Sequence, residues 1–351
     1  MNLPVKTYLH FLFTRNYINM SSLVLRIVVF CVFFPTLLQA QGQSQTSPPM
    51  PAAIRQSMQA LGEPELYLAD IEKSKSGLKL GTPVNITRRP GYDNQPSFTP
   101  DSRSILYSSM REDFQTDIYK YSIKDSNTVR LTNTTESEYS PSIFPADGQS
   151  IIVVRVEKDS TQRLWRFDAS GGNPQVLLDS VKGIGYYGWL GASSLGLFVL
   201  GRERNLPFTL QITSFDAENP HGAGLPKPDT IESKIGRCIR RVPSSIAGSQ
   251  LAASFVHKIN DSAWMLKRVN VKNRIVSQIC PTVTGAEDYV WTGNGTVIMG
   301  QGLKLFARHA RKDNAWHEIA DFSKTISVGY IKRLALSPDE KRLVFVVQEK
   351  P

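Results

Sequence analysis

Residues 96–107 read Pro-Ser-Phe-Thr-Pro-Asp-Ser-Arg-Ser-Ile-Leu-Tyr. Apolar residues on both sides flank a segment that contains Pro100 and Asp101. Proline presets the backbone for the first corner of a tight turn, and aspartate accepts a hydrogen bond from the chain two residues on. The pattern therefore predicts two short strands joined as a β-hairpin.

The same hairpin recurs along the chain at a fixed interval. It returns as Pro141-Ser-Ile-Phe-Pro-Ala-Asp-Gly-Gln-Ser-Ile-Ile-Val153 and as Leu334-Ala-Leu-Ser-Pro-Asp-Glu-Lys-Arg-Leu-Val-Phe345. Asp101 and Asp147 are 46 residues apart, and Asp147 and Asp339 are 192 apart, which is four steps of 48. Weaker turns near the missing steps are Gly191-Ala192, Ala247-Gly248 and Asn294-Gly295. A period in the forties, with four short strands in each unit, predicts an all-β fold, a six-bladed β-propeller.

The two ends of the chain are expected to share one blade. The last hairpin is followed by only a few residues, so its blade lacks two strands there. Two N-terminal strands, Glu65–Ile71 and Pro83–Ile86, belong to no other unit. We expect them to complete the last blade, because such a latch removes open sheet edges that invite aggregation.

The first 40 residues have the composition of a secretory signal. They carry three basic residues and no acidic one, and an apolar run at 27–38 ends just before Ala40. A basic start, a short apolar core and a small residue before a polar stretch predict export, with cleavage after Ala40. The apolar run is too short for a membrane span of about 20 residues. An uncleaved anchor is the alternative.

Three segments are therefore expected. Residues 1–40 form the signal peptide, whose true start is proposed at Met20. Residues 41–62 form a linker with a short helix, and residues 63–351 form the propeller. We expect a periplasmic or extracellular location and no transmembrane span in the mature chain.

The charge and the cysteine content restrict the possible partners and the possible disulfides. The formal net charge is +10, but the densest basic run, Arg237–Arg241, is short. Nucleic-acid binding needs a concentrated basic face, so we expect no nucleic-acid partner. Cys238 and Cys280 are predicted on the innermost and outermost strands of one blade, too far apart for a disulfide.

The first repeat carries a family resemblance. Pro96–Ser109 is followed by Arg111 and then by Asp117-Ile-Tyr119. This succession resembles the repeat of TolB-type propellers, which are relatives of WD-like (WD40-type) repeats. The resemblance implies a periplasmic or cell-surface propeller that binds other proteins. It does not extend to the α/β domain of TolB, since only residues 41–62 stand in its place.

Signatures of catalysis are incomplete in this sequence. Gly191-Ala-Ser-Ser-Leu-Gly196 has the wrong spacing for the Gly-x-Ser-x-Gly nucleophile elbow. His317-Glu318 lacks the second histidine of a zinc-binding His-Glu-x-x-His motif. We therefore predict no catalytic residue, no metal ligand and no cofactor. The alternative is a calcium-dependent propeller enzyme, lactonase-like or hydrolase-like, in which loop carboxylates supply some of the six to eight oxygens that calcium requires.

Tyrosines recur just before the predicted innermost strands, in five of the six units. The loops that lead into these strands surround one mouth of the central channel, and tyrosine is well suited to recognition surfaces. We therefore predict a non-catalytic module that binds a protein or peptide, such as an envelope protein, at this mouth. The predicted binding residues are Tyr92, Asp93, Glu138, Tyr139, Tyr187, Asp288, Tyr289 and Tyr330. The alternative is that these rings wedge between adjacent blades, as Trp189 and Trp291 are expected to do in the core.

Overall fold

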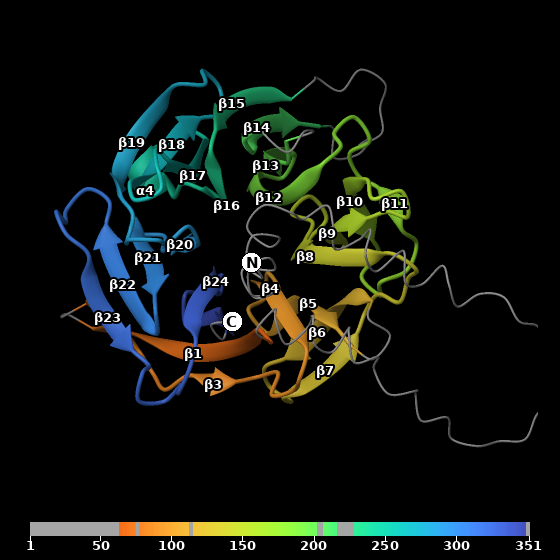
Figure 1. The fold of residues 1–351 in the computed structure, drawn as a ribbon, viewed down its shortest axis with the longest axis horizontal. Helices are drawn as coiled ribbons and strands as arrows, with labels where there is room; N and C mark the ends of the chain where they lie inside the picture. The colour runs from red at the N-terminus through yellow and green to blue at the C-terminus, as the bar shows by residue number, and fades with distance from the viewer. Residues whose placement is uncertain (1–62, 75–76, 112–114, 202–205, 216–227, 349–351) are drawn as a thin grey trace, which may run out of the picture.

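The structure is a computed structural model that describes residues 63–74, 77–111, 115–201, 206–215 and 228–348. Six small antiparallel sheets form a ring (Figure 1), and we call the region that their innermost strands surround the central channel. The fold is thus the six-bladed β-propeller that the repeat predicted. The predicted signal peptide at 1–40, the start at Met20 and the linker with its helix at 41–62 lie outside the described residues.

Five of the blades are four-stranded meanders whose strands follow one another in chain order from the centre of the ring outward. Blade 1 consists of β4 (Tyr92–Phe98), β5 (Ser104–Met110), β6 (Thr116–Ser122) and β7 (Asn127–Arg130). Blade 2 consists of β8 (Ser137–Ile143), β9 (Ile151–Val156), β10 (Gln162–Phe167) and β11 (Gln175–Val176). Blade 3 consists of β12 (Ile184–Gly191), β13 (Ser194–Val199), β14 (Thr209–Ser214) and β15 (Asp229–Ser233).

The next two blades follow the same plan, with one short helix added. Blade 4 consists of β16 (Ile235–Arg241), β17 (Ala252–Lys258), β18 (Trp264–Asn270) and β19 (Val276–Pro281), with α4 (Ser244–Ala247) between its first two strands. Blade 5 consists of β20 (Tyr289–Trp291), β21 (Thr296–Gln301), β22 (Lys304–His309) and β23 (His317–Asp321). Cys238 and Cys280 lie on β16 and β19, and both are free and buried, as expected.

Blade 6 joins the two ends of the described chain. It consists of β24 (Tyr330–Leu336), β25 (Arg342–Gln348), β1 (Glu65–Ser74), β2 (Gly77–Leu80) and β3 (Val84–Asn85). β1 pairs antiparallel with β25, with Leu66 opposite Val346 and Tyr67 opposite Phe345. The predicted latch is confirmed. The additional strand β2 was not predicted, because it is only four residues long; its half-buried face, Leu78 and Leu80, packs against the core.

The hydrophobic core lies between neighbouring blades. Leu66, Val344 and Val346 of blade 6 pack against Ile105 and Tyr107 of blade 1, and all five are almost fully buried. The latch therefore closes a sheet and also provides one wall of an inter-blade core. Through these contacts, blade 6, which includes the innermost strand β24, is fixed against its neighbour in the ring.

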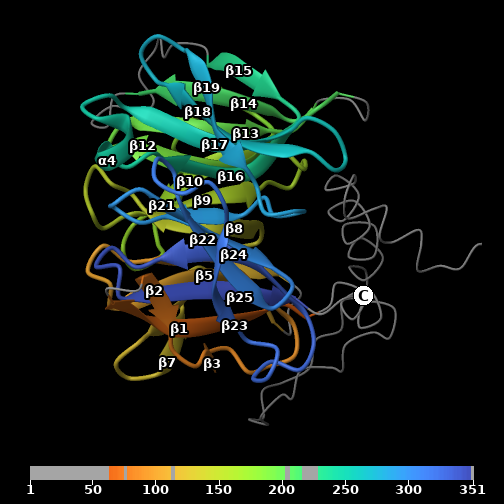
Figure 2. The same cartoon turned by 90° about the vertical axis from the view of Figure 1, so that its left-hand side faces the viewer.

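The two faces of the ring carry different loops. The loops that lead into each innermost strand, together with the turns between second and third strands, open on the face seen in Figure 1, which we call the mouth face. The turns between first and second strands, which include α4, lie on the opposite face (Figure 2). Within the described part of the chain, no helix is long and apolar enough to cross a bilayer.

Candidate functional site

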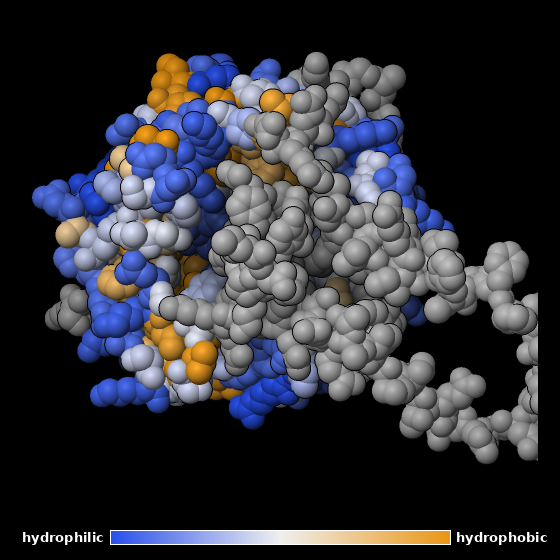
Figure 3. Space-filling model, viewed as in Figure 1, coloured by the Kyte–Doolittle hydropathy of each residue, from blue (hydrophilic) through white to orange (hydrophobic). Residues whose placement is uncertain are grey.

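A cavity of about 300 Å³ opens on the mouth face where blades 4, 5 and 6 meet. We call it the mouth pocket. Its polar and aromatic lining residues are Arg237, Thr284, Glu287, Asp288, Gln301, Tyr330 and Lys332. In Figure 3, the part of this face that carries colour is mostly hydrophilic, with hydrophobic patches at the lower left and at the top. Pockets of this kind, with convergent polar groups, are the usual location of binding sites.

An ion-pair cluster forms one wall of the mouth pocket. Arg237 donates to Asp288 through Nε, at 3.2 Å, and through Nη2, and its Nη1 contacts Glu287. Lys258 Nζ lies 2.7 Å from Glu287 Oε2. Burial opposes ionisation of Asp288, but Arg237 and then Arg333 outweigh it and hold the pKa of this carboxyl well below its usual range. The wall is therefore charged and held in place by bidentate pairing.

A β-bulge in each of several innermost strands sets the geometry of the channel. Gln95, Ser140 and Arg333 adopt left-handed φ values of 56°, 53° and 54° at bulges in β4, β8 and β24. The bulge turns the Arg333 backbone N–H toward Asp288 Oδ2, at 3.2 Å. The Arg333 side chain donates through Nη2 to the Tyr186 hydroxyl at 2.9 Å, so it connects blades 6 and 3 on opposite sides of the ring. Bulges commonly re-aim side chains in this way beside functional sites.

Lys332 is next to this bulge and lines the mouth pocket. Its Nζ lies 5.7 Å from the centroid of the Tyr330 ring. Burial, and then the nearby charges of Arg237 and Arg333, lower the pKa of Lys332 to about 7. The amine therefore changes its charge near neutral pH.

Of the residues predicted from the sequence, Asp288 and Tyr330 are brought together in the mouth pocket. Three other tyrosines lie between blades, which is the alternative that the sequence left open. Tyr187 donates to Ile152 O at 2.8 Å, and Tyr289 is fully buried with its hydroxyl 2.9 Å from Ser254 Oγ. Tyr139 accepts from Thr116 Oγ1 at 3.3 Å. These rings support the packing of adjacent blades, as do the indoles of Trp189 and Trp291.

The remaining predicted residues, Tyr92, Asp93 and Glu138, belong to blades 1 and 2. Tyr92 is half-buried at the start of β4. Asp93 is fully buried and pairs with Arg89 at 3.2 Å, while burial raises the pKa of this carboxyl. These residues do not line the mouth pocket, whose walls come from blades 4, 5 and 6.

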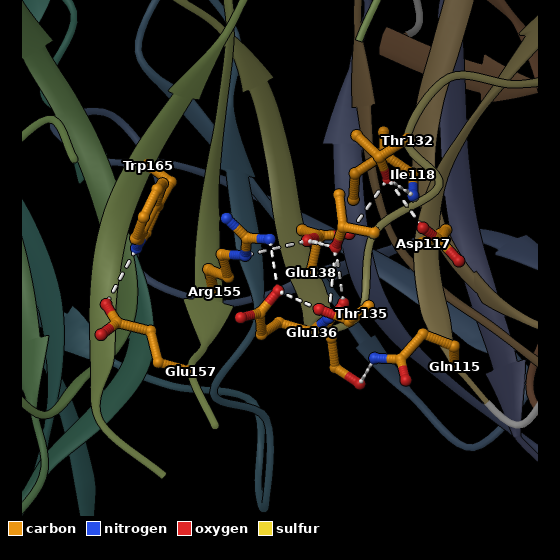
Figure 4. A network of polar contacts seen from close by, with 12 residues as sticks. Gln115, Asp117, Ile118, Thr132, Thr135, Glu136, Glu138, Arg155, Glu157 and Trp165 are labelled. Atoms are coloured by element: carbon orange, nitrogen blue, oxygen red, sulfur yellow. Dashed lines mark hydrogen bonds and ion pairs between the residues drawn. The ribbon is translucent and has the colours of Figure 1, made fainter. Parts of the chain in front are cut away.

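Glu138 is the centre of a buried polar network (Figure 4). It lies 3.2 Å from Arg155 Nε and 3.1 Å from Thr132 Oγ1, which is also 3.2 Å from Asp117 Oδ1. Because a hydroxyl has one proton, Thr132 donates to only one of the two carboxyls at a time. Burial raises the pKa of Glu138 to about 8, so this carboxyl holds a proton at neutral pH.

The sequence reasoning missed Arg237, Glu287 and Lys332, which complete the mouth pocket. One signal was available. Glu287 and Asp288 directly precede β20, and Lys332 lies within β24, so charged residues stand at or just before the innermost strands of neighbouring units. Within the described ranges, no group of three or more histidine, cysteine or acidic residues is arranged to hold a metal ion.

Comparison with known proteins supports the fold. No family profile matches the sequence. A candidate TolB protein of Agrobacterium tumefaciens has a similar structure, with a TM-score of 0.59 and 13% identity over 82% of this chain and 99% of that one. A chain of a nidogen/laminin complex gives a TM-score of 0.51 at 10% identity, over 82% of this chain and all of that one. An uncharacterized protein of Agrobacterium fabrum is 25% identical over 128 residues, which span 34% of this chain and 41% of that protein.

Proposed function

We propose that this chain is an exported, non-catalytic propeller that binds a protein or peptide partner at its mouth pocket. The observation that carries the proposal is the pocket itself: a concave site of about 300 Å³ with charged and aromatic groups converging on it. The N-terminal composition of residues 1–40 supports export.

The walls of the mouth pocket favour recognition because they are held rigidly. They come from three blades, and the Arg237 cluster ties the blade 4 wall to the blade 5 wall. A preorganised surface loses little conformational entropy when a partner binds. Tyr330 adds a half-buried ring at the rim, and tyrosine is among the residues enriched at interfaces.

The proposal is tested by photo-crosslinking in cells of the source organism. A photoreactive amino acid replaces Gln301, which is exposed at the mouth pocket, or Gln149, which is exposed at a turn on the opposite face. We expect a discrete partner adduct from position 301 and none from position 149. Equal adducts from both positions, or an adduct from position 149 alone, would contradict the proposal.

The calcium-dependent propeller enzyme is the alternative. It requires stoichiometric calcium in the purified protein and a fall in melting temperature when the ion is chelated, since a ligand that binds only the folded state stabilises it. Binding through the mouth pocket requires neither.

A further inference from the structure

The mouth pocket is lined by two bases and two acids, and two further bases pair with those acids from outside the lining. Two carboxylates, Glu287 and Asp288, face the basic side chains of Arg237, Lys258 and Arg333. Arg237 contacts both acids, Lys258 pairs with Glu287, and Arg333 Nη1 lies 3.8 Å from Asp288. The two carboxylates thus already form ion pairs with three bases, none of which is Lys332.

Lys332 is the fourth base of this group and, with Arg237, one of the two that line the cavity. Across the described ranges, no carboxylate lies within ion-pair distance of its amine, and Asp288 and Glu287 act on it only from farther away. The amine lies 5.7 Å from the centroid of the Tyr330 ring. Lysine is rarely buried without a partner, because desolvation of an ammonium is costly. Burial and the neighbouring guanidinium groups already lower the pKa of this amine to about 7. An anionic ligand group would supply the missing charge.

The surroundings of the pocket favour a peptide over an acidic sugar. Val328, two residues before Tyr330, is 55% exposed, and Ile259, next to Lys258, is 46% exposed. Both lie in loops of the mouth face, close in sequence to residues of the pocket lining and its ion-pair cluster, so apolar side chains are exposed on the face where the charged cavity opens. A peptide offers an acidic side chain flanked by apolar ones, which matches this arrangement.

We propose that Lys332 recognises an acidic side chain in a peptide segment of the partner, with Val328 and Ile259 contacting apolar residues beside it. This inference rests on the proposed function and specifies its ligand. The ligand carboxylate pairs with the Lys332 ammonium, while Arg237 remains bound to Glu287 and Asp288 and holds the pocket open.

The experiment is selection from a phage-displayed random peptide library, carried out in parallel with several forms of the full chain. The forms are wild type, Lys332→Met, Lys332→Arg and the control Lys182→Met. Lys182 is an exposed lysine on the same face, so its substitution makes the same change in net charge outside the pocket. Thermal melting verifies that each form is folded, and Lys332→Gln replaces Lys332→Met if the latter is not.

We expect wild type and Lys182→Met to enrich peptides with a fixed aspartate or glutamate. Lys332→Met should lose this preference and bind the selected peptide at least about tenfold more weakly, as for the loss of a charge-assisted hydrogen bond. Lys332→Arg should retain part of the affinity. An acidic preference that survives in Lys332→Met, or peptides without any acidic preference, would overturn the inference and leave peptide binding intact.

Two other outcomes contradict the proposed function itself. In one, wild type selects no peptide and does not bind an oligogalacturonate probe in calorimetry. In the other, it selects no peptide but binds this probe, which would identify an acidic sugar as the ligand. Failure of the inference and failure of the function therefore give different results.

Discussion

Removing Arg237 is expected to destabilise the mouth-pocket wall strongly. Arg237→Ala leaves Glu287 and Asp288, whose side chains are 13% and 8% exposed, without their shared guanidinium. Breaking a buried ion pair from one side costs about 3–5 kcal/mol. Lys258 still pairs with Glu287, and Arg333 still donates to Asp288. We therefore expect a loss near the lower end, about 3 kcal/mol in the free energy of unfolding.

The pH dependence gives this prediction its specificity. In wild type, Asp288 has a pKa below its unfolded value, so its contribution to stability is present above pH 3.8 and is lost as the pH falls through the folded pKa. In Arg237→Ala, the ionised Asp288 carboxylate has lost the guanidinium that stabilises it most, so most of this pH-dependent contribution to stability is absent. The difference in stability between the two proteins should therefore be large at pH 7 and should shrink below about pH 4.

Urea unfolding followed by tryptophan fluorescence measures this difference. The matched control is Arg274→Ala, which removes a guanidinium from an exposed pair with Asp229 at 2.7 Å. Exposed pairs contribute at most about 1 kcal/mol, so the control should unfold almost as wild type does. An Arg237→Ala protein as stable as the control at pH 7, or a deficit that is unchanged at acidic pH, would refute the reasoning.

Three further predictions concern the latch, the blade 2 network and the pocket lysine. Leu66→Ala should lower the free energy of unfolding by about 2–5 kcal/mol, because Leu66 is fully buried between blades 6 and 1. The control Val84→Ala, at a half-exposed site, should change the free energy of unfolding little in the same urea titration. Equal effects of the two substitutions would contradict the latch. Burial raises the pKa of Glu138 to about 8, so the stability of wild type should fall as the pH rises toward 8, whereas that of Glu138→Gln should not. Melting temperatures that change with pH in the same way in both proteins, between pH 5 and 9, would contradict this. Because the pKa of Lys332 is about 7, affinity for an acidic peptide should fall about tenfold between pH 6 and pH 8, as calorimetry would measure, and an unchanged affinity would count against an ammonium–carboxylate contact.

The blades were predictable because their signals are local. Each of the clearest hairpins carries its own Pro/Asp turn, and the Asp101 carboxylate accepts a hydrogen bond from the Arg103 backbone N–H at 3.0 Å. The latch followed from a count of unmatched strands, which needs only the repeat. The strand β2 was missed because it has only four residues, Gly77–Leu80, and the alternation of Leu78 and Leu80 with Gly77 and Lys79 is too short to identify a strand.

The site was only partly predictable because adjacent residues of a strand point in opposite directions. Asp288 turns to the channel and lines the pocket, whereas Tyr289 turns into the core between blades. Tyr186 likewise meets Arg333 across the channel, whereas the next residue, Tyr187, bonds to the neighbouring blade. At Tyr186 the register also shifts, between Ile184 and Tyr186, and the sequence does not reveal such a bulge.

The most direct measurement of the central claim is a crystal structure of the propeller with the partner segment recovered by crosslinking at position 301. We predict that the segment occupies the mouth pocket, with an acidic side chain beside Lys332 and the Tyr330 ring against its backbone. A segment bound along the outer strands or on the face that carries α4, with the mouth pocket unfilled, would contradict the account.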